Sequence, residues 1–308
     1  SSRLAPLLLR WYRRVRRPLP WRRCHDPYRV WVAETMLQQT TIAAVLPRYE
    51  KFLTRFPDLR ALAKARVGSV LRQWAGLGYY SRARNMHAAA RKILAQHNGI
   101  IPRDEHSLRA LPGVGPYTAA ALLSIAYNQP AAVLDGNVKR VLCRLDGVRG
   151  DVRRPRTQSL LLTRAQNLID PRHPGDWNQA LMELGETICT PSSPRCGDCP
   201  ARKFCAALKM GLQDQLPRLG PRPKPAELKW TCLWIEDRGR VLLWKRSHQE
   251  LVLKSHWGLP EVGQVRADVG RVLKAVRHAI TRYRITLTVR QARLVGPKPS
   301  AAAWMRRG

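Results

Sequence analysis

Four cysteines close together late in the chain constrain its fold more strongly than any other feature of the sequence. They follow the spacing C-x6-C-x2-C-x5-C, at Cys189, Cys196, Cys199 and Cys205. Four thiolates in one short loop can hold a tetrahedral zinc ion or a cubane iron–sulfur cluster, so this loop is expected to fold around a metal. Zinc sites usually combine two C-x2-C pairs, and only one such pair is present. The spacing therefore favours a 4Fe-4S cluster, with zinc as the alternative.

The net charge narrows the class of partner. The chain has 308 residues, and its 55 Lys and Arg against 21 Asp and Glu give a formal charge of +34. So many positive side chains repel one another unless a polyanion neutralises them. Basic side chains that neutralise phosphates also release counterions, which favours binding. Nucleic acid is therefore the first candidate. No apolar stretch approaches the roughly 20 residues needed to span a bilayer, so a membrane protein is not expected.

The cysteine count and the first residues indicate the compartment. Seven cysteines are an odd number with four in one loop, which favours a metal site in a reducing compartment over a disulfide framework. The apolar stretch at residues 4–9 is too short for a secretion signal and lacks a cleavage site. We expect a soluble monomer in the bacterial cytoplasm, associated with the nucleoid.

Hydrophobic periodicity predicts a helical domain first. Apolar residues recur at helical spacing from about residue 31 to residue 191, where the alternation typical of strands is missing. We therefore expect an all-α domain over residues 1–205. Prolines interspersed with Arg and Lys predict an extended linker over residues 206–227.

The last part of the chain has a different pattern. Two β-rich runs, at 230–235 and 241–245, are joined by Glu-Asp-Arg-Gly, which suits a hairpin turn. Residues 269–279 have the pattern of a helix, and residues 285–290 have that of another strand. This mixture predicts a small α/β domain over residues 228–308.

Paired glycines mark a candidate DNA-binding turn. Residues 111–119, Leu-Pro-Gly-Val-Gly-Pro-Tyr-Thr-Ala, lie between two expected helices. Gly113 and Gly115 let backbone N–H groups approach a phosphate closely, and a helix opening at Pro116 adds a favourable dipole. The pattern is typical of the hairpin in helix-hairpin-helix DNA-binding proteins. A tight turn without a ligand is the alternative.

Two carboxylates stand out by their surroundings. Asp135 lies 20 residues beyond Gly115, where a helix is expected to begin, and in isolation it predicts an N-cap. Glu34 lies on an otherwise apolar helical segment, and burial would raise its pKa so that it holds a proton near neutral pH. A half-exposed helical Glu is the alternative. Together they match the two carboxylates that cleavage of a glycosidic bond requires.

Several segments carry a family resemblance. The cysteine spacing resembles the cluster loop of the endonuclease III superfamily of DNA glycosylases, here residues 189–205. The chain also resembles the MutY family of adenine DNA glycosylases along nearly its whole length. The resemblance implies a helix-hairpin-helix glycosylase that excises adenine mispaired with 8-oxoguanine or guanine from double-stranded DNA. The segments that carry it are LPWR at 19–22, DPYR at 26–29, GLGYYSRARN at 76–85 and LDGNVKR at 134–140.

The same resemblance implies roles for individual residues. Glu34 would protonate adenine N7 and later activate water, and Asp135 would stabilise or transiently bond the sugar C1′. Tyr117 and Asn137 would support them. Bifunctional relatives carry a Lys where Tyr117 stands, for Schiff-base chemistry, so a monofunctional hydrolase is implied. Family members line the adenine pocket with one group of residues and insert a second group into the duplex as the base is flipped out. The pocket positions are Trp21, Arg22, Leu37 and Gln179, and the wedge positions are Gln39 and Tyr79.

The C-terminal domain resembles the Nudix-like module with which the family recognises 8-oxoguanine. Residues 258–278 contain no run of paired glutamates, so pyrophosphatase activity is not expected. Relatives usually carry Phe-Ser-His in the lesion-recognition loop, where this chain has Ile280, Thr281 and Arg282. Thr281 keeps a hydroxyl and is the candidate lesion-binding residue.

Three alternatives remain. A thymine or uracil mismatch glycosylase can share the Tyr and the cluster, although the attached C-terminal domain favours adenine. A non-catalytic, cluster-containing DNA-binding protein would keep the scaffold, but retention of both carboxylates argues against it. RNA or ribosome binding rests on net charge alone, since no RNA-binding module is recognisable.

Overall fold

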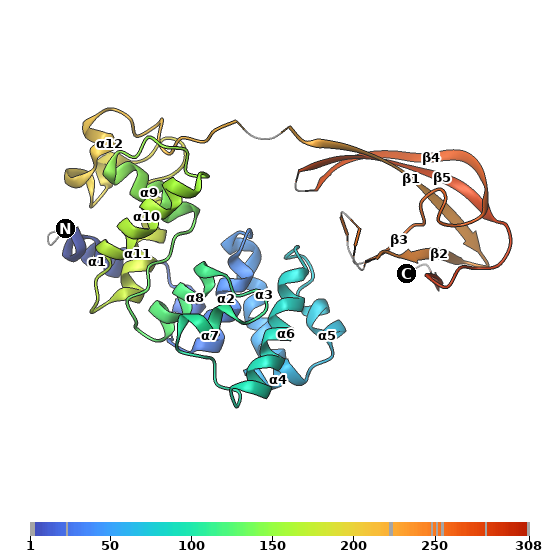
Figure 1. The fold of residues 1–308 in the computed structure, drawn as a ribbon, viewed down its shortest axis with the longest axis horizontal. Helices are drawn as coiled ribbons and strands as arrows, with labels where there is room; N and C mark the ends of the chain where they lie inside the picture. The colour runs from blue at the N-terminus through green and yellow to red at the C-terminus, as the bar shows by residue number, and fades with distance from the viewer. Residues whose placement is uncertain are drawn as a thin grey trace. The chain divides into compact units, whose positions relative to one another are not determined.

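The computed structural model describes residues 4–22, 24–221, 224–247, 249–250, 252–253, 256–280 and 282–306. The chain divides into two compact units, Ser1–Gly220 and Pro221–Gly308 (Figure 1). None of the helices in these described segments has the length and apolar character required to cross a membrane.

Helices and connecting loops build the first unit, as its apolar periodicity predicts. The α-helices are α1 Leu4–Val15, α2 Pro27–Leu37, α3 Ile42–Arg55, α4 Leu59–Lys64, α5 Val67–Gln73, α6 Ser81–Gln96, α7 Glu105–Arg109, α8 Pro116–Ala121, α9 Gly136–Asp146, α10 Pro155–Leu168, α11 Pro174–Thr187 and α12 Ala206–Lys209. Shorter turns are the 3-10 segments η1 Pro20–Arg22, η3 Cys196–Asp198 and η4 Arg202–Phe204, and the π-helix η2 Leu122–Ala126.

Helix α2 lies in the middle of the first unit. A helix with one apolar stripe buries only that stripe, whereas α2 is apolar on nearly all sides and is buried at almost every position from Tyr28 to Met36. It packs against α3, α6, α8 and η2. Because Glu34 lies within this buried run, the elements packed around α2 shield its side chain from water.

Two polar residues define where the functional helices begin. Asp26 caps α2, and its carboxylate accepts a hydrogen bond from the Arg29 amide at 2.8 Å. Asp135 caps α9 and accepts from the Val138 amide at 2.7 Å. Each cap satisfies an N–H that has no partner within its helix. The N-cap expected at Asp135 is therefore present.

Helices α9 and α11 approach closely at a glycine. A Cβ added at Gly185 of α11 would lie 2.7 Å from the Cβ of Asn137 and 3.1 Å from its Cα. Separations this short are not tolerated between carbon atoms, so the crossing depends on the missing side chain. The close approach places Asn137 directly against α11.

The expected linker over residues 206–227 differs from the structure. Residues 206–220 belong to the first unit, and they include α12. The Leu216 carbonyl accepts from Nε of Arg144 at 2.8 Å, and the Arg218 carbonyl accepts from the Val152 amide at 3.2 Å. These hydrogen bonds hold the segment against the helical unit, so it is not a free extended linker.

A mixed sheet forms the second unit. Its strands are β1 Ala226–Asp237, β2 Arg240–Lys245, β3 Trp257–Gly258, β4 Ala267–Ile280, β5 Tyr283–Leu294 and β6 Ala302–Arg306. The strand order is β3-β2-β1-β5-β4, with β6 paired to β2. Strands β1 and β5 are parallel and the other pairs are antiparallel. The predicted hairpin is formed, since Asp237 pairs with Arg240.

One predicted element of this unit is wrong. Residues 269–279 form part of strand β4, not a helix. Val269, Val272, Leu273 and Val276 recur at helical spacing, yet pairing with β5 along nearly the whole strand overrides that pattern. The architecture of a helical unit followed by a small sheet-containing unit is otherwise as expected.

Candidate active site

One cleft of about 910 Å³ gathers the residues expected to act together. Its lining comes from helices far apart in sequence, since α2, α8, α9 and α11 each contribute side chains. Thr281, by contrast, lies outside the described residues. The predicted site residues that line the cleft are Trp21, Arg22, Glu34, Leu37, Gln39, Tyr79, Gly113, Gly115, Tyr117, Asp135, Asn137 and Gln179.

Glu34 is a buried acid with a shifted pKa. Its exposed fraction is 6%, and its Oε2 accepts a hydrogen bond from the Tyr117 hydroxyl at 2.6 Å. The pKa of Glu34 is raised to about 7, mainly by burial and also by the charge of Asp135, while the Tyr117 hydrogen bond and the Arg22 charge oppose the rise. A carboxyl with this pKa can donate a proton near neutral pH.

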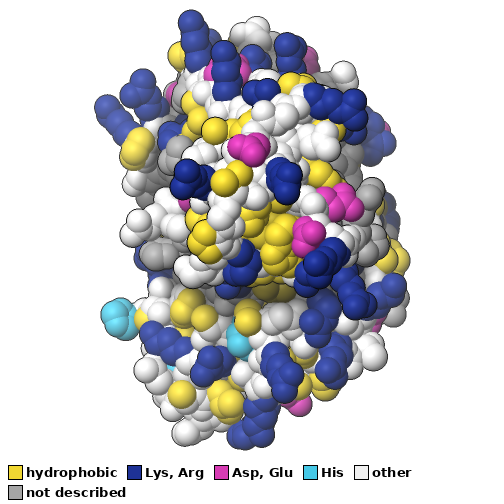
Figure 2. All heavy atoms as spheres, turned by 90° about the vertical axis from the view of Figure 1, so that its right-hand side faces the viewer, with side chains coloured by type: hydrophobic (Ala, Val, Ile, Leu, Met, Phe, Trp, Pro, Cys, Tyr) yellow, Lys and Arg dark blue, Asp and Glu magenta, His cyan; other side chains and the backbone are white. Residues whose placement is uncertain are grey.

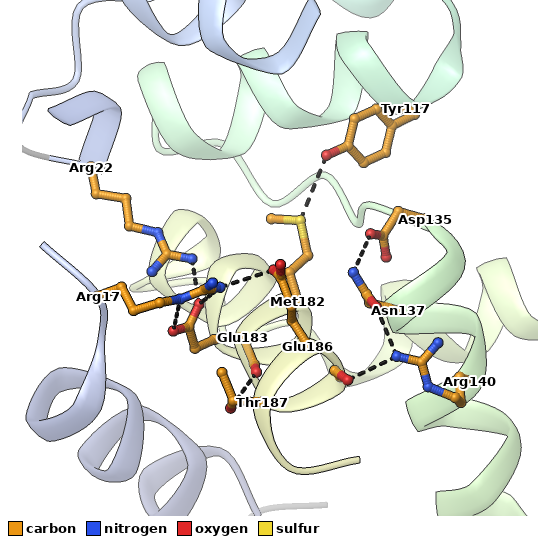
Figure 3. Close-up of polar contacts among 11 residues, drawn as sticks. Arg17, Arg22, Tyr117, Asp135, Asn137, Arg140, Met182, Glu183, Glu186 and Thr187 are labelled. Atoms are coloured by element: carbon orange, nitrogen blue, oxygen red, sulfur yellow. Dashed lines mark hydrogen bonds and ion pairs between the residues drawn. The ribbon is translucent and has the colours of Figure 1, made fainter. Parts of the chain in front are cut away.

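Tyr117 is fixed at the Glu34 carboxyl. Its hydroxyl also contacts the Met182 sulfur at 3.6 Å (Figure 3). Burial and the nearby charges of Glu34 and Asp135 raise the pKa of Tyr117 well above its usual value. The phenol therefore stays protonated and serves as a hydrogen-bond donor.

Asp135 faces the same cleft from the start of α9. Its Oδ1 accepts from the Val138 amide, and its Oδ2 accepts from Nδ2 of Asn137 at 3.2 Å (Figure 3). Burial raises its pKa above the usual value, and these hydrogen bonds and the charge of Arg140 oppose that rise only in part. The donors and the helix N-terminus favour the carboxylate form, which can stabilise positive charge in the cleft.

The hairpin at residues 111–119 forms the expected turn. Gly113 has φ +76°, and a Cβ added there would lie 2.7 Å from the Cβ of Asn85, so this position requires glycine. Gly115 is the N-cap of α8, and the space around it is open to 4 Å. Pro116 begins α8, as predicted. Gly113 and Gly115 therefore lie just before the N-terminus of α8, a position that suits a phosphate.

The four cysteines line a second cavity of the first unit. Each is a free thiol that is partly buried. Burial raises the pKa of Cys196, Cys199 and Cys205, so thiolates there would need a cation. In the described part of the chain, no three His, Cys, Asp or Glu side chains are placed to hold a single metal ion.

A buried arginine contacts two of these cysteines. Arg144 is 2% exposed, and its Nη1 donates to the Cys189 sulfur at 3.2 Å and to the Thr190 carbonyl at 2.7 Å. The Cys205 thiol donates to the Arg144 carbonyl at 3.3 Å. A guanidinium so close to sulfur stabilises negative charge there, as a set of thiolate ligands requires.

Comparison with known proteins identifies the family. A family described as HhH-GPD superfamily base excision DNA repair protein matches residues 32–166. The adenine DNA glycosylase of Mus musculus is 44% identical over 225 residues, which is 70% of this chain and 44% of the relative. That of Buchnera aphidicola subsp. Baizongia pistaciae (strain Bp) is 39% identical over 246 residues, or 78% of this chain and 69% of the relative. The chain belongs to the adenine DNA glycosylase family.

The match to this family is partial in length and is supported by a known fold. The chain spans less than half of the mouse adenine DNA glycosylase. A solved structure of a thermostable thymine-DNA glycosylase superposes with a TM-score of 0.62 and 28% identity, covering 68% of this chain and 96% of that one. The helical fold is therefore shared beyond the adenine DNA glycosylase family.

The structure of this adenine DNA glycosylase family member also shows polar residues near the cleft that the sequence did not single out. Glu183 is 1% exposed and accepts from Nε of Arg17 and from Nη2 of Arg22, each at 2.7 Å (Figure 3). Arg17 also donates to Glu186 at 2.9 Å. Glu183 is an acid within an apolar helical run, and the same signal that indicated Glu34 would have found it. Arg17 carries no local signal, because its partners lie more than 160 residues away.

Proposed function

We propose that the protein hydrolyses the N-glycosidic bond of adenine mispaired with 8-oxoguanine or guanine in double-stranded DNA. The observation that carries the proposal is the pairing of Glu34, a buried acid with a pKa of about 7, with Asp135 in one cleft. One acid of such a pair protonates the leaving group, and the other stabilises the oxocarbenium-like sugar. Membership of the adenine DNA glycosylase family supports adenine as the leaving base.

The side chains have distinct parts in this reaction. Glu34 would give its proton to adenine N7 and then, as a carboxylate, take a proton from the attacking water. Asp135 would stabilise or transiently bond C1′ of the sugar. Tyr117 would hold the Glu34 carboxyl through the 2.6 Å hydrogen bond, and Asn137 would hold Asp135. Because position 117 is a Tyr and not a Lys, no Schiff base forms there and the enzyme is monofunctional.

The cleft can receive a base that has left the helix. Trp21, Leu37 and Gln179 would enclose adenine, and Arg22 supplies a cation beside it. Among the described residues, Nη1 of Arg22 has no hydrogen-bond partner, so it can donate to a ring nitrogen. Extrusion of the base costs a few kcal/mol, which contacts of this kind offset.

Duplex DNA is the partner that the charge supports. Lys and Arg side chains are far more numerous than Asp and Glu on the face drawn in Figure 2, in line with the net charge of +34. The hairpin with Gly113 and Gly115 would bind one phosphate, and Gln39 and Tyr79 would wedge into the stack. We propose that the protein acts as a monomer on nucleoid DNA in a bacterial cytoplasm.

The cysteines fit a 4Fe-4S cluster as the cofactor. Four free thiols surround one cavity, and Arg144 donates to one of them. Cys189, Cys196, Cys199 and Cys205 would hold the cluster, whose role would be to fold the loop that packs against α9. The second unit would recognise 8-oxoguanine as a Nudix-like domain, with Thr281 as its lesion contact.

A panel of duplexes tests the proposed function. Purified protein is incubated with A:8-oxoguanine, A:G, T:G, U:G and fully paired duplexes, and alkali-labile sites are followed under single-turnover conditions. Base release confined to the two adenine mispairs is expected. Glu34→Gln should lower the rate about 10²- to 10⁴-fold, while the exposed Glu50→Gln should not. Absence of alkali-labile sites in A:8-oxoguanine would contradict the proposal.

A thymine or uracil mismatch glycosylase is the second candidate. The structural match to a thymine-DNA glycosylase at 28% identity favours it. Release from T:G or U:G duplexes in the same panel, with adenine mispairs intact, would establish this function in place of the first.

A further inference from the structure

The half-buried Arg82 joins two segments that line the rim of the cleft. Arg82 lies in the first turn of α6, and its guanidinium reaches both the end of α2 and the turn at residues 76–79. Nη1 donates to the carbonyls of Thr35, Met36 and Gln38 at 2.8, 2.9 and 2.5 Å. Nη2 donates to the hydroxyl of Thr40 and to the carbonyls of Leu77 and Gly78 at 3.0, 2.9 and 3.3 Å.

The contacts with α2 satisfy the end of a helix. The last carbonyls of a helix have no partner within it, and the negative end of the helix dipole attracts a cation. Arg82 meets both needs for α2. The chain beyond this end turns sharply, because Gln39 adopts φ +55°, a left-handed conformation that non-glycine residues seldom take. Gln39 is exposed there.

The contacts with residues 76–79 hold a second strained turn. Gly76 and Gly78 have φ values of +84° and +69°, and Tyr79 has φ +44°. The Tyr79 side chain is 50% exposed, and its ring lies 5.7 Å from the Arg82 guanidinium. Trp74 also contacts this region, since its ring lies 5.4 Å from the Arg82 guanidinium and its Nε1 donates to the Gly78 carbonyl.

Gln39 and Tyr79 are therefore two exposed side chains, each on a left-handed residue, and the residues beside them in the chain, Gln38 and Thr40 on one side and Gly78 on the other, share one guanidinium. Such conformations persist only where the surrounding contacts impose them. The Thr40 hydroxyl adds a weaker contact with the Leu77 carbonyl at 3.4 Å. The planar guanidinium has five N–H donors in a fixed fork, which suits carbonyls from two directions, whereas an ammonium has three donors at one point.

We propose that Arg82 is a positioning residue that fixes Gln39 relative to Tyr79, so that both side chains enter the duplex together. The inference rests on the proposed function, because it gives these two residues a shared place in extruding the base. Arg82 touches neither base nor sugar in this scheme. It acts through the two segments that it joins.

The first test uses the free protein and needs no catalysis. Hydrogen exchange of peptides covering residues 36–41 and 76–80 is compared by mass spectrometry for wild type, Arg82→Gln, Arg82→Lys and Arg91→Gln. Arg91 is exposed farther along α6, so its variant is a matched loss of charge. Arg82→Gln and Arg82→Lys should both speed exchange in the two segments, and Arg91→Gln should not. Unchanged exchange, or a change in only one segment, would overturn the proposal.

The second test measures extrusion directly. A duplex carries 2-aminopurine in place of the adenine opposite 8-oxoguanine, and every protein also carries Glu34→Gln so that no base is released. Arg82→Lys should lower the fluorescence rise by about fivefold with little change in the dissociation constant. An unchanged rise, or a loss that follows weaker binding alone, would contradict the assignment.

A double-mutant cycle separates positioning from general loss of stability. Tyr79→Ala should slow single-turnover base release by about fivefold or more when Arg82 is present, and much less in the Arg82→Lys protein. Strictly multiplicative effects would overturn the coupling. If wild type releases no base from any duplex, the proposed function fails, and the exchange result still decides whether Arg82 joins the two segments.

Discussion

Arg140 donates a hydrogen bond from Nη2 to the side-chain oxygen of Asn137 at 2.8 Å (Figure 3). Asn137 in turn donates to Asp135, and Nε of Arg140 donates to the Cys189 carbonyl at 2.7 Å. Hydrogen bonds therefore run without a break from the cysteine loop to the carboxylate that faces the cleft. These bonds connect the position of the Asp135 carboxylate to the fold of that loop.

Arg140→Gln is expected to lower single-turnover base release by about 10- to 100-fold, because a misplaced carboxylate loses its alignment with the sugar. DNA binding should change little. Arg164→Gln, which removes a salt bridge between a partly exposed side chain and Asp146 on the neighbouring helix, is the matched control. Far-UV circular dichroism and the thermal unfolding midpoint, recorded on the same samples, show whether the protein is still folded. An unaltered rate in Arg140→Gln would show that Asp135 is held without this arginine.

The rate of base release should depend on pH through Glu34. Its pKa is about 7, and the protonated form is the acid, so the rate should be highest below that pH. Above it the rate should fall about tenfold per pH unit. Single-turnover rates between pH 5 and 9 at constant ionic strength measure this falling limb of the pH–rate profile. A rate that keeps rising through this range would rule out Glu34 as the proton donor.

Tyr117→Phe should move that limb to higher pH. The Tyr117 hydroxyl stabilises the Glu34 carboxylate and so lowers its pKa, and removing the hydroxyl leaves burial less opposed. Tyr127→Phe is the control. It removes a tyrosine hydroxyl that donates a hydrogen bond of similar length, 2.7 Å to the Ile101 carbonyl, but does not line the cleft, so the pH at which the rate falls should not change. A shift toward lower pH in Tyr117→Phe would mean that the hydroxyl does not favour the charged form.

Glu34 should also make the stability of the protein depend on pH. Its pKa is raised in the folded state, so its stabilising contribution is complete below its unfolded pKa near 4.5 and is lost as pH rises to about 7. Relative to wild type, Glu34→Gln should gain on the order of 3 kcal/mol in free energy of unfolding between pH 4.5 and 8. Urea unfolding of both proteins at these two pH values measures the difference. A constant difference would show that Glu34 does not titrate on unfolding.

Local sequence patterns predicted the elements whose causes are local. The apolar surroundings of Glu34 indicated its burial, and the position of Asp135 after a loop indicated its cap, because caps and helical faces depend on neighbouring residues. Strand β4 was missed for the opposite reason. Its valines fit a helix, and only pairing with β5 decides its conformation.

The site shows the same division. Each acid could be found from its neighbours in the sequence, whereas the arginines that hold the site together come from distant parts of the chain. Arg17 reaches Glu183 across 166 residues, and Arg82 reaches Thr35 across 47. An arginine in a chain with 55 basic residues has no distinguishing mark in the sequence. Its role becomes visible only when the folded backbone brings acceptors to it.

The missing side chain at Gly185 has a consequence for both ends of α9. The helix starts at the Asp135 cap, and farther along it Arg140 and Arg144 contact the cysteine loop, so a shift of α9 at its contact with Gly185 would be felt at both places. Even one methyl group at that contact would push α9 away from α11. One substitution at this crossing would therefore displace the Asp135 carboxylate and the cysteine loop in the same motion.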